Sequence, residues 1–253
     1  MSIPARIIAR LDIKGPNIVK GIHMEGLRVI GDPNKFASLY YEQGADEIIF
    51  IDTVASLYGR NHILSVVEKA ARNIFIPMTV GGGIRTIEDI KSLLRSGADK
   101  VAINTAAINN PAFLSQASEA FGSQCIVLSI EAKKQPEGHW ECYTDNGRER
   151  TNKNVMDWVF EAEKLGVGEM FVTSVDCEGA REGFDLALLE EIHKRVHVPV
   201  IAGGGAGSAK DVLDLLDKPR AEAVCCASLF HYKLQTIPEL KHALAKAGHE
   251  VRL

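Results

Sequence analysis

Two glycine triplets stand at matching places along the chain and have the chemistry of phosphate-binding loops. Gly81–Gly83 follows the apolar stretch Ile76–Val80, and Gly203–Gly205 follows Val198–Ala202. Glycine has no Cβ, so its backbone approaches an oxyanion closely, and successive N–H groups at the start of a helix favour phosphate. A single triplet is equally well explained as a tight turn. Two triplets 122 residues apart favour two phosphate sites, and hence a ligand with a phosphate at each end.

Polar residues that follow the next apolar stretch in each half of the chain can complete these sites. Asn104 and Thr105 come after residues 99–103, and Ser228 comes after residues 222–226. Their hydroxyl, amide and N–H groups are further donors for phosphate oxygens. The expected phosphate-binding residues are Gly82, Gly83, Asn104 and Thr105 at one site and Gly204, Gly205 and Ser228 at the other.

Asp12 and Glu131, which are 119 residues apart, each interrupt the end of an apolar stretch. A carboxylate at such a place is costly unless it is paired or functional. Two carboxylates that face each other across a substrate suit general acid–base catalysis, in which one takes a proton while the other donates one. The alternative is that each carboxylate forms a structural ion pair with the nearby Lys14, Lys20 or Lys133.

A second group of acidic residues, Asp52, Asp176 and Glu178, follows two further apolar stretches. These carboxylates could orient the hydroxyl groups of a sugar or hold lysines in place. Lone acidic residues in such loops are also common as helix caps, so both interpretations stay open.

Alternating strands and helices must position these groups. Apolar, β-branched runs predict strands near 6–11, 47–51, 76–80, 99–103, 124–130, 169–173, 199–202 and 222–226. The spacing of apolar residues predicts helices over 33–43, 63–74, 86–95, 110–120, 153–165, 185–195, 208–216 and 236–247. Eight strands, each followed by a helix, predict an α/β fold of the (β/α)8 (TIM) barrel type, for which ~250 residues is the usual length.

An internal repeat divides this barrel into halves. Ile76–Ile90 is similar to Val198–Val212, and the carboxylates Asp12 and Glu131 have nearly the same separation. We therefore expect one domain over residues 1–253, built from half-barrels at about 1–122 and 123–253 with a pseudo-twofold axis between them.

Two segments are longer than ordinary loops. Residues 14–32 follow the first predicted strand, and residues 133–152 follow the fifth and contain the tight-turn sequence Asp145-Asn146-Gly147. Both leave the carboxyl ends of strands, where TIM barrels carry their active sites, so we expect lids or binding loops.

Composition restricts the partners and the compartment. The net charge is −4, without a dominant basic run, which argues against nucleic acid and membrane surfaces as partners. Five cysteines without metal-type spacing, and the lack of a leader or an apolar span, predict a cytoplasmic protein. No motif indicates a metal or an organic cofactor.

Motifs over nearly the whole chain resemble the cyclase subunit of imidazole glycerol phosphate synthase, from histidine biosynthesis. The matching segments are Arg6–Asp12, Val19–Gly21, Gly31–Pro33, Thr79–Ile84, Gly97–Val101, Ile103–Ala107, Phe121–Gln124, Gly168-Glu169, Thr173-Ser174, Gly203–Gly207 and Phe230-His231. The resemblance implies a barrel that receives ammonia through its core from a glutaminase subunit docked at the N-terminal face of the strands. It also implies ring closure to imidazole glycerol phosphate, with release of an aminoimidazole carboxamide ribotide.

The resemblance also implies roles for single residues. Asp12 would be the general acid, Glu131 would be the second catalytic carboxylate, and Lys20 and Thr173 would lie near the substrate. A ring of charges at the ammonia entrance would be formed by Arg6, Glu47, Lys100 and Glu169. The same ring could instead be a salt-bridged plug, and the two interpretations are compatible.

Four positions depart from the family pattern, in which Glu131 and Glu178 are aspartates, Gly203 is a serine and Arg10 is a cysteine. These changes favour, as an alternative, a paralogue that activates a glutaminase and channels ammonia for another amidation, such as that of a surface-glycan sugar, with weak or no cyclase activity. A sugar-phosphate isomerase of the neighbouring pathway step is a third hypothesis. The full-length match disfavours it.

Overall fold

Eight parallel strands form a closed barrel in the computed structural model, which describes residues 4–55, 63–217 and 222–253. Closure follows from the pairing, because β1 lies between β12 and β4 while β7 lies between β6 and β10. The barrel strands are β1 (Arg6–Lys14), β4 (Glu47–Asp52), β5 (Met78–Gly81), β6 (Lys100–Ile103), β7 (Ile126–Lys134), β10 (Glu169–Ser174), β11 (Val200–Gly203) and β12 (Ala223–Cys226). The predicted (β/α)8 barrel is confirmed.

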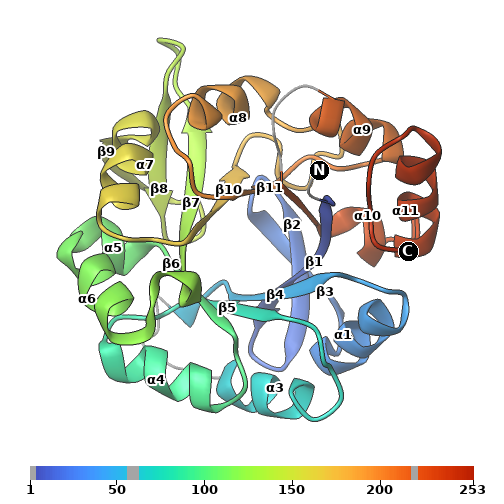
Figure 1. Ribbon diagram of the computed structural model, residues 1–253, viewed down its shortest axis with the longest axis horizontal. Coiled ribbons are helices and arrows are strands. Elements are labelled where there is room, and N and C mark those ends of the chain that lie inside the picture. The colour runs from blue at the N-terminus through green and yellow to red at the C-terminus, as the bar shows by residue number, and fades with distance from the viewer. Residues whose placement is uncertain (1–3, 56–62, 218–221) are drawn as a thin grey trace.

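Helices surround the strands on the outside of the barrel (Figure 1). They are α1 (Pro33–Glu42), α3 (Ile63–Ala70), α4 (Ile87–Arg95), α6 (Ala112–Phe121), α7 (Val155–Lys164), α8 (Leu186–His193), α9 (Ala209–Asp217) and α11 (Ile237–Lys246). Local sequence explains their starts. In α4, the Thr86 side chain accepts from the Asp89 N–H and the Asp89 carboxylate accepts from the Thr86 N–H, which is a capping box.

The two long loops are β-hairpins. β2 (Asn17–Ile22) and β3 (Glu25–Gly31) extend from β1, and β8 (Trp140–Thr144) and β9 (Glu149–Asn154) extend from β7. The turn expected at Asp145-Asn146-Gly147 joins β8 to β9, with positive φ at all three residues. The first hairpin was not predicted as strands, because its glycines hid the alternating pattern. Both hairpins stand at the carboxyl end of their barrel strand.

The elements of the two half-barrels correspond. Each half begins with a strand that carries a hairpin, β1 or β7. Each half ends with a strand followed by a short helix, which is α5 (Thr105–Asn109) after β6 and α10 (Ser228–His231) after β12. Sequence patterns did not predict these two helices, because five and four residues are too few to show a helical period.

Alternation along the strands separates two hydrophobic cores. On β1, Ile7 and Leu11 pack in the large core between strands and helices, while Ile8 packs inside the barrel. Side chains on one strand alternate between faces, so Arg10 and Asp12 share the inward face with Ile8. The inner core consists of Ile8, Ile49, Ala102, Val127, Phe171, Ile201, Ala223 and Cys225. Polar groups at the inward positions above this core must therefore face the carboxyl end of the barrel.

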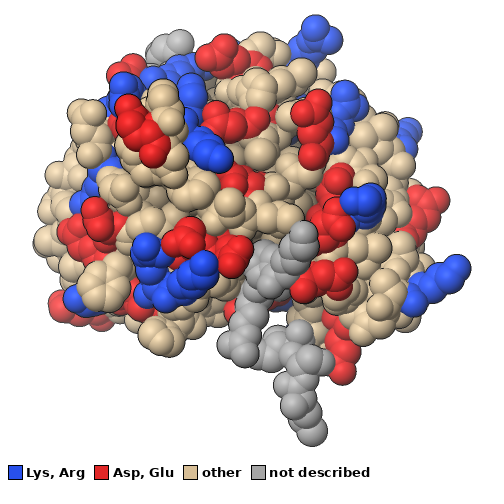
Figure 2. Space-filling view, turned by 90° about the horizontal axis from the view of Figure 1, so that it is seen from above, with Lys and Arg blue, Asp and Glu red and all other residues tan. Residues whose placement is uncertain are grey.

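Charged side chains of both signs are interspersed on the face shown in Figure 2. Within the described ranges, no helix is both long and apolar enough to cross a bilayer.

A buried ion pair attaches α11 to the start of the barrel. Lys241 donates to Asp46 at 3.0 Å and to the Gly44 carbonyl at 2.7 Å, and the second oxygen of Asp46 accepts from the Ile7 N–H at 2.7 Å. Lys241 and Asp46 are both buried. The pair therefore connects the C-terminal helix with β1 and the segment before β4.

We predict that Lys241→Ala lowers the free energy of unfolding by about 3 kcal/mol, because it leaves the buried Asp46 carboxylate without its cation. Urea denaturation followed by circular dichroism measures this. Lys246→Ala, at an exposed position of the same helix, is the matched control and should change stability by less than about 0.5 kcal/mol. Equal effects of the two substitutions would show that the ion pair contributes nothing specific.

Candidate active site

Two pockets lie at the carboxyl ends of the strands, one beside each glycine triplet. The first, here the Gly82 pocket, is lined by Ile51, Asp52, Thr53, Gly82, Gly83, Ile84, Ala102, Ile103, Asn104, Thr105, Ser129, Glu131, Asp145 and Asn146. The second, here the Gly204 pocket, is lined by Arg10, Glu178, Gly179, Gly204, Gly205, Ala206, Cys225, Cys226, Ala227 and Ser228. All seven residues expected at phosphate sites therefore line a pocket, and each lies in the half to which it was assigned.

The glycines are required first by the turns themselves. Gly82 has φ +98°, and a Cβ there would lie 2.2 Å from the Asp52 carbonyl oxygen. Gly205 has φ +119°, and its Cβ would lie 1.9 Å from the carbonyl oxygen of Gly183. Both backbone conformations strongly favour glycine. The tight-turn interpretation therefore holds at both triplets, and the same turns expose backbone to the pockets.

Neighbouring loops hold the polar wall of the Gly82 pocket in place. Asn104 donates from Nδ2 to the Tyr143 carbonyl of β8 at 3.1 Å, which ties the start of α5 to the second hairpin. Asp52 accepts from the N–H groups of Val54 and Ala55 at 3.0 and 2.9 Å. Asp52 thus stabilises the loop after β4, as the helix-cap interpretation expects, while it also lines the pocket.

Asp12 lies in a buried network of alternating charges. Arg10 donates from Nε to Asp12 Oδ1 at 2.7 Å, and Lys20 donates from Nζ to Asp12 Oδ2 at 2.9 Å. Lys20 also pairs with Glu178, whose second oxygen is 3.6 Å from Arg10 Nη1. The sequence-based ion pair between Asp12 and Lys20 is thus present. It belongs to a four-residue cluster that also includes Arg10.

This network sets the charge of Asp12. Burial alone would raise the pKa of the Asp12 carboxyl, but Arg10 and then Lys20 outweigh it and lower the pKa to about 2. Burial lowers the pKa of Lys20, but the carboxylates of Asp12 and Glu178 outweigh it and raise this pKa above its usual value. Asp12 is therefore an ionised carboxylate throughout the neutral range, without a proton to donate.

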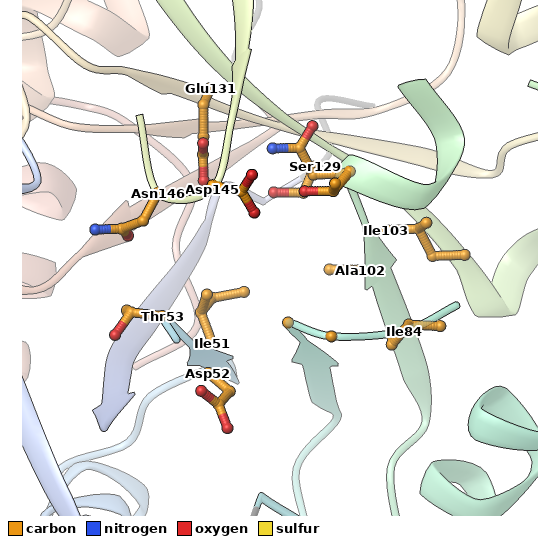
Figure 3. Close-up of a pocket in the computed structure, with 14 residues that line it drawn as sticks. Ile51, Asp52, Thr53, Ile84, Ala102, Ile103, Ser129, Glu131, Asp145 and Asn146 are labelled. Atoms are coloured by element: carbon orange, nitrogen blue, oxygen red, sulfur yellow. The ribbon is translucent and has the colours of Figure 1, made fainter. Parts of the chain in front are cut away.

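Glu131 has the opposite environment. Burial raises the pKa of its carboxyl to about 7, and the hydrogen bond from the Gly147 N–H at 2.8 Å only partly offsets this. Lys133, its suggested partner, instead lies over the Tyr143 ring, at 5.3 Å from the centroid. Figure 3 shows Glu131 reaching from β7 toward the space bounded by Ile51 and Ala102. A carboxyl that titrates near neutrality in a pocket suits proton transfer.

Thr173 connects the two sides of the site. In β10 it is in register with Glu131 of β7 and with Gly203 of β11. Its hydroxyl accepts from Arg10 Nη1 at 3.2 Å. Thr173 is buried, so its present contact is with the Asp12 network.

The four charges expected at the other end of the barrel form a closed ring. Each is the first residue of a strand, in β1, β4, β6 and β10. Arg6 contacts Glu47 at 2.6 Å and Glu169 at 2.5 Å, and Lys100 contacts the same two carboxylates at 3.1 and 2.8 Å. Each cation thus bridges both acids, which gives the geometry of a salt-bridged closure at the N-terminal end.

Some residues of the site were missed from the sequence. Ser129, Asp145 and Asn146 line the Gly82 pocket, and Arg10 lines the Gly204 pocket. Arg10 had been named only as a departure from the family pattern. Ser129 and Arg10 could both have been assigned to the site, since each precedes a candidate carboxylate by two residues and therefore shares its inward face. Asp145 and Asn146 had been assigned to a turn within an expected lid or binding loop, but not to the site, because their approach to the pocket depends on the path of the hairpin.

We predict that Glu131 makes stability depend on pH. A carboxyl whose pKa rises on folding, here to about 7, stabilises the protonated fold, and this contribution is lost as pH rises from about 4.5 through 7. Since Glu131 as a whole is only half-buried, we expect the free energy of unfolding to fall by roughly 1–2 kcal/mol more in the wild type than in Glu131→Gln between pH 5 and pH 8. The measurement is urea denaturation of both proteins at pH 5 and pH 8. An equal change in the free energy of unfolding in the two proteins would contradict the raised pKa.

Comparisons with known proteins agree with this geometry. Residues 6–236 match the family described as histidine biosynthesis protein. A protein of Legionella pneumophila named imidazole glycerol phosphate synthase subunit HisF is 59% identical over 206 residues, 81% of this chain and 97% of that protein. Proteins with the same name from Streptococcus sanguinis (strain SK36) and Bacillus cereus (strain Q1) are 46% and 47% identical over 248 residues, 98% of each chain. The chain belongs to the histidine biosynthesis protein family, which it shares with these HisF subunits.

Proposed function

We propose that this chain is the cyclase subunit of an imidazole glycerol phosphate synthase, a lyase of histidine biosynthesis. It uses ammonia to close an imidazole ring, and it forms imidazole glycerol phosphate and an aminoimidazole carboxamide ribotide. The observation that carries the proposal is the match to HisF subunits over 98% of the chain, combined with two glycine-lined pockets and the inward-facing carboxylates of Asp12 and Glu131.

The two pockets give the substrate its orientation. One phosphate lies against Gly82, Gly83, Asn104 and Thr105, and the other lies against Gly204, Gly205 and Ser228. A substrate bound at both ends places its central, reacting part between the inward-facing carboxylates of β1 and β7. Fixing both ends supplies orientation, which is a large part of the rate advantage of a bound reactant.

The charges around the carboxylates divide the proton transfers between them. The resemblance assigns the acid role to Asp12, but Arg10 and Lys20 hold this carboxylate ionised. Glu131, with its raised pKa of about 7, carries a proton over part of the neutral range. Glu131 is therefore the proton donor in this proposal, and Asp12 stabilises positive charge or accepts a proton.

Ammonia is supplied by a separate glutaminase subunit. We place its docking site at the N-terminal face of the barrel, around the ring of Arg6, Glu47, Lys100 and Glu169. Behind the ring lies the inner core, which is mostly apolar and leads toward the carboxylates. Opening of the ring would admit a small neutral molecule such as ammonia to this interior.

The alternative of a subunit that channels ammonia for another amidation is not favoured by the comparisons, since the similar proteins share the name of the synthase subunit. Three of the four departures noted from the sequence lie at the site as the cyclase proposal describes it. Glu131 lines the Gly82 pocket, while Glu178 and Arg10 are members of the Asp12 network.

We predict that Asp12→Asn and Glu131→Gln each lower the turnover of the histidine-pathway intermediate, with ammonium salt as the nitrogen source, by about 10² to 10⁴, the usual contribution of acid–base catalysis. Glu119→Gln, an exposed carboxylate of α6, is the control. Formation of imidazole glycerol phosphate by the wild type supports the proposal. Absence of product at high enzyme concentration would reject it in favour of the channelling alternative.

The pH profile tests the division of roles. If Glu131 donates a proton, the turnover rate at subsaturating ammonia, divided by the concentration of free NH₃, should fall as pH rises above about 7, where Glu131 loses its proton. Division by free NH₃ is needed because ammonia itself increases with pH. Glu131→Gln should lack this descending limb, whereas a limb that persists in Glu131→Gln would assign it to another group.

We predict that Lys100→Ala lowers turnover driven by glutamine and the glutaminase by more than about fivefold, the lower range of coupling between distant sites, because it breaks two of the four contacts in the ring. Turnover driven by ammonium salt should stay close to the wild type. Lys91→Ala, on the surface of α4, is the control. Equal loss in both assays would instead indicate damage to the fold.

A further inference from the structure

One inward position distinguishes the two pockets. Arg10 precedes Asp12 by two residues on β1, and Ser129 precedes Glu131 by two residues on β7, so both pairs are 119 residues apart. Arg10 lines the Gly204 pocket, and Ser129 lines the Gly82 pocket. The two side chains therefore occupy equivalent places in the half-barrels. One place carries a cation and the other a neutral hydroxyl.

The pockets consequently differ in charge. The lining of the Gly82 pocket contains Asp52, Glu131 and Asp145, and none of its described lining residues is a lysine or arginine. The lining of the Gly204 pocket contains Arg10 and one carboxylate, Glu178, which Lys20 neutralises from its other side. A dianion meets repulsion in the first pocket and a guanidinium in the second.

Arg10 is held in a fixed position with donor capacity left over. It is 4% exposed and lies over the Phe171 ring, at 5.4 Å from the centroid. Nε donates to Asp12 and Nη1 donates to Thr173, while Nη2 makes none of the hydrogen bonds found among the described residues. A planar guanidinium presents five N–H donors and stays protonated, so this end of the group is available to an acceptor.

A second donor in the same pocket also lacks a partner. The Ser228 hydroxyl is buried, with the residue 5% exposed, and its Oγ has no hydrogen-bond partner among the described residues. Buried polar atoms are nearly always satisfied, so an unpaired hydroxyl in a pocket wall points to an external acceptor. Arg10 and Ser228 both line this one pocket.

We propose that Arg10 is a direct cationic ligand for an oxyanion in the Gly204 pocket, so that phosphate binds more tightly there than in the Gly82 pocket. This inference rests on the proposed function for the identity of the doubly phosphorylated substrate. It adds that one phosphate of this substrate binds more tightly than the other. Charge-assisted hydrogen bonds from arginine to phosphate are about twice as strong as neutral ones. Phosphate at the Gly204 pocket shares the guanidinium with Asp12 and Glu178.

The first test uses the wild-type protein and inorganic phosphate. Backbone amide resonances of Gly204, Gly205 and Ser228 report one pocket, and those of Gly82, Gly83 and Asn104 report the other. A titration followed by ¹H–¹⁵N NMR at pH 7.5 should shift the first set at a phosphate concentration at least about tenfold lower than the second, the effect of one good charge-assisted contact. Equal midpoints, or the reverse order, overturn the proposal without any variant.

The second test uses Arg10→Ser, which copies the equivalent Ser129. Its Gly204-pocket resonances should need at least about tenfold more phosphate, while the midpoint of the Gly82-pocket resonances stays unchanged. Ser129→Ala, at the equivalent position of the other half, should leave the Gly204-pocket midpoint unaltered. An unchanged Gly204-pocket midpoint in Arg10→Ser overturns the proposal. If this variant does not fold, the order of the two phosphate midpoints in the wild-type protein tests the proposal.

The phosphate titrations and the cyclase assay test the two proposals separately. Cyclase turnover with equal phosphate midpoints rejects the role of Arg10 and leaves the proposed function intact. The expected order of midpoints without cyclase turnover rejects the proposed function and leaves Arg10 as an anion ligand for a different phosphorylated compound.

Discussion

Closure of eight parallel strands is the constraint on which the rest of this molecule depends. All the strands run in one direction, so every carboxyl end opens onto the same face, and alternation along each strand decides which side chains reach the axis. Through this constraint, residues as distant as Asp12 and Glu178 become neighbours around Lys20. The hydrophobic layers fill the barrel and hold it closed. The polar ends of the strands are then available for chemistry.

Two carboxylates at equivalent positions of the half-barrels have acquired opposite electrostatic properties. Asp12 has a cation on each oxygen and a lowered pKa, while Glu131 has one backbone N–H and a raised pKa. The difference is not in the acids but in what surrounds them. Arg10 faces Asp12, whereas the equivalent Ser129 gives Glu131 no cation. The cations of Arg10 and Lys20, which have no counterpart beside Glu131 in its hydrogen bonds, therefore separate the two carboxylates electrostatically.

The polar groups at the two ends of the barrel differ in how fully they are paired. At the N-terminal end, Arg6 and Lys100 each bridge Glu47 and Glu169, so the ring satisfies itself and closes the interior. At the carboxyl end, some polar side chains lack a hydrogen-bond partner among the described residues, as the Ser228 hydroxyl does. A closed network stabilises a fold, while unused donors in a pocket are available to a ligand. The glycine turns serve both purposes, since Gly82 and Gly205 permit tight turns and leave backbone open toward the pockets.

The sequence by itself determined the barrel, the positions of its eight strands and outer helices to within a few residues, the internal repeat and the seven glycine, amide and hydroxyl residues expected in the two pockets. It could do so because alternation, helical period and glycine requirements are local properties. Local rules still misplaced the start of β5, which begins at Met78 because Pro77 has no N–H for the ladder. Only the tertiary structure decided which charges meet. The pairing of Lys20 with Glu178, 158 residues away, and the approach of Asp145 to the Gly82 pocket depend on the tertiary structure. The pKa of a buried carboxyl follows from its burial and from all the charges that the fold brings near it, of which a chain neighbour such as Arg10 is only one.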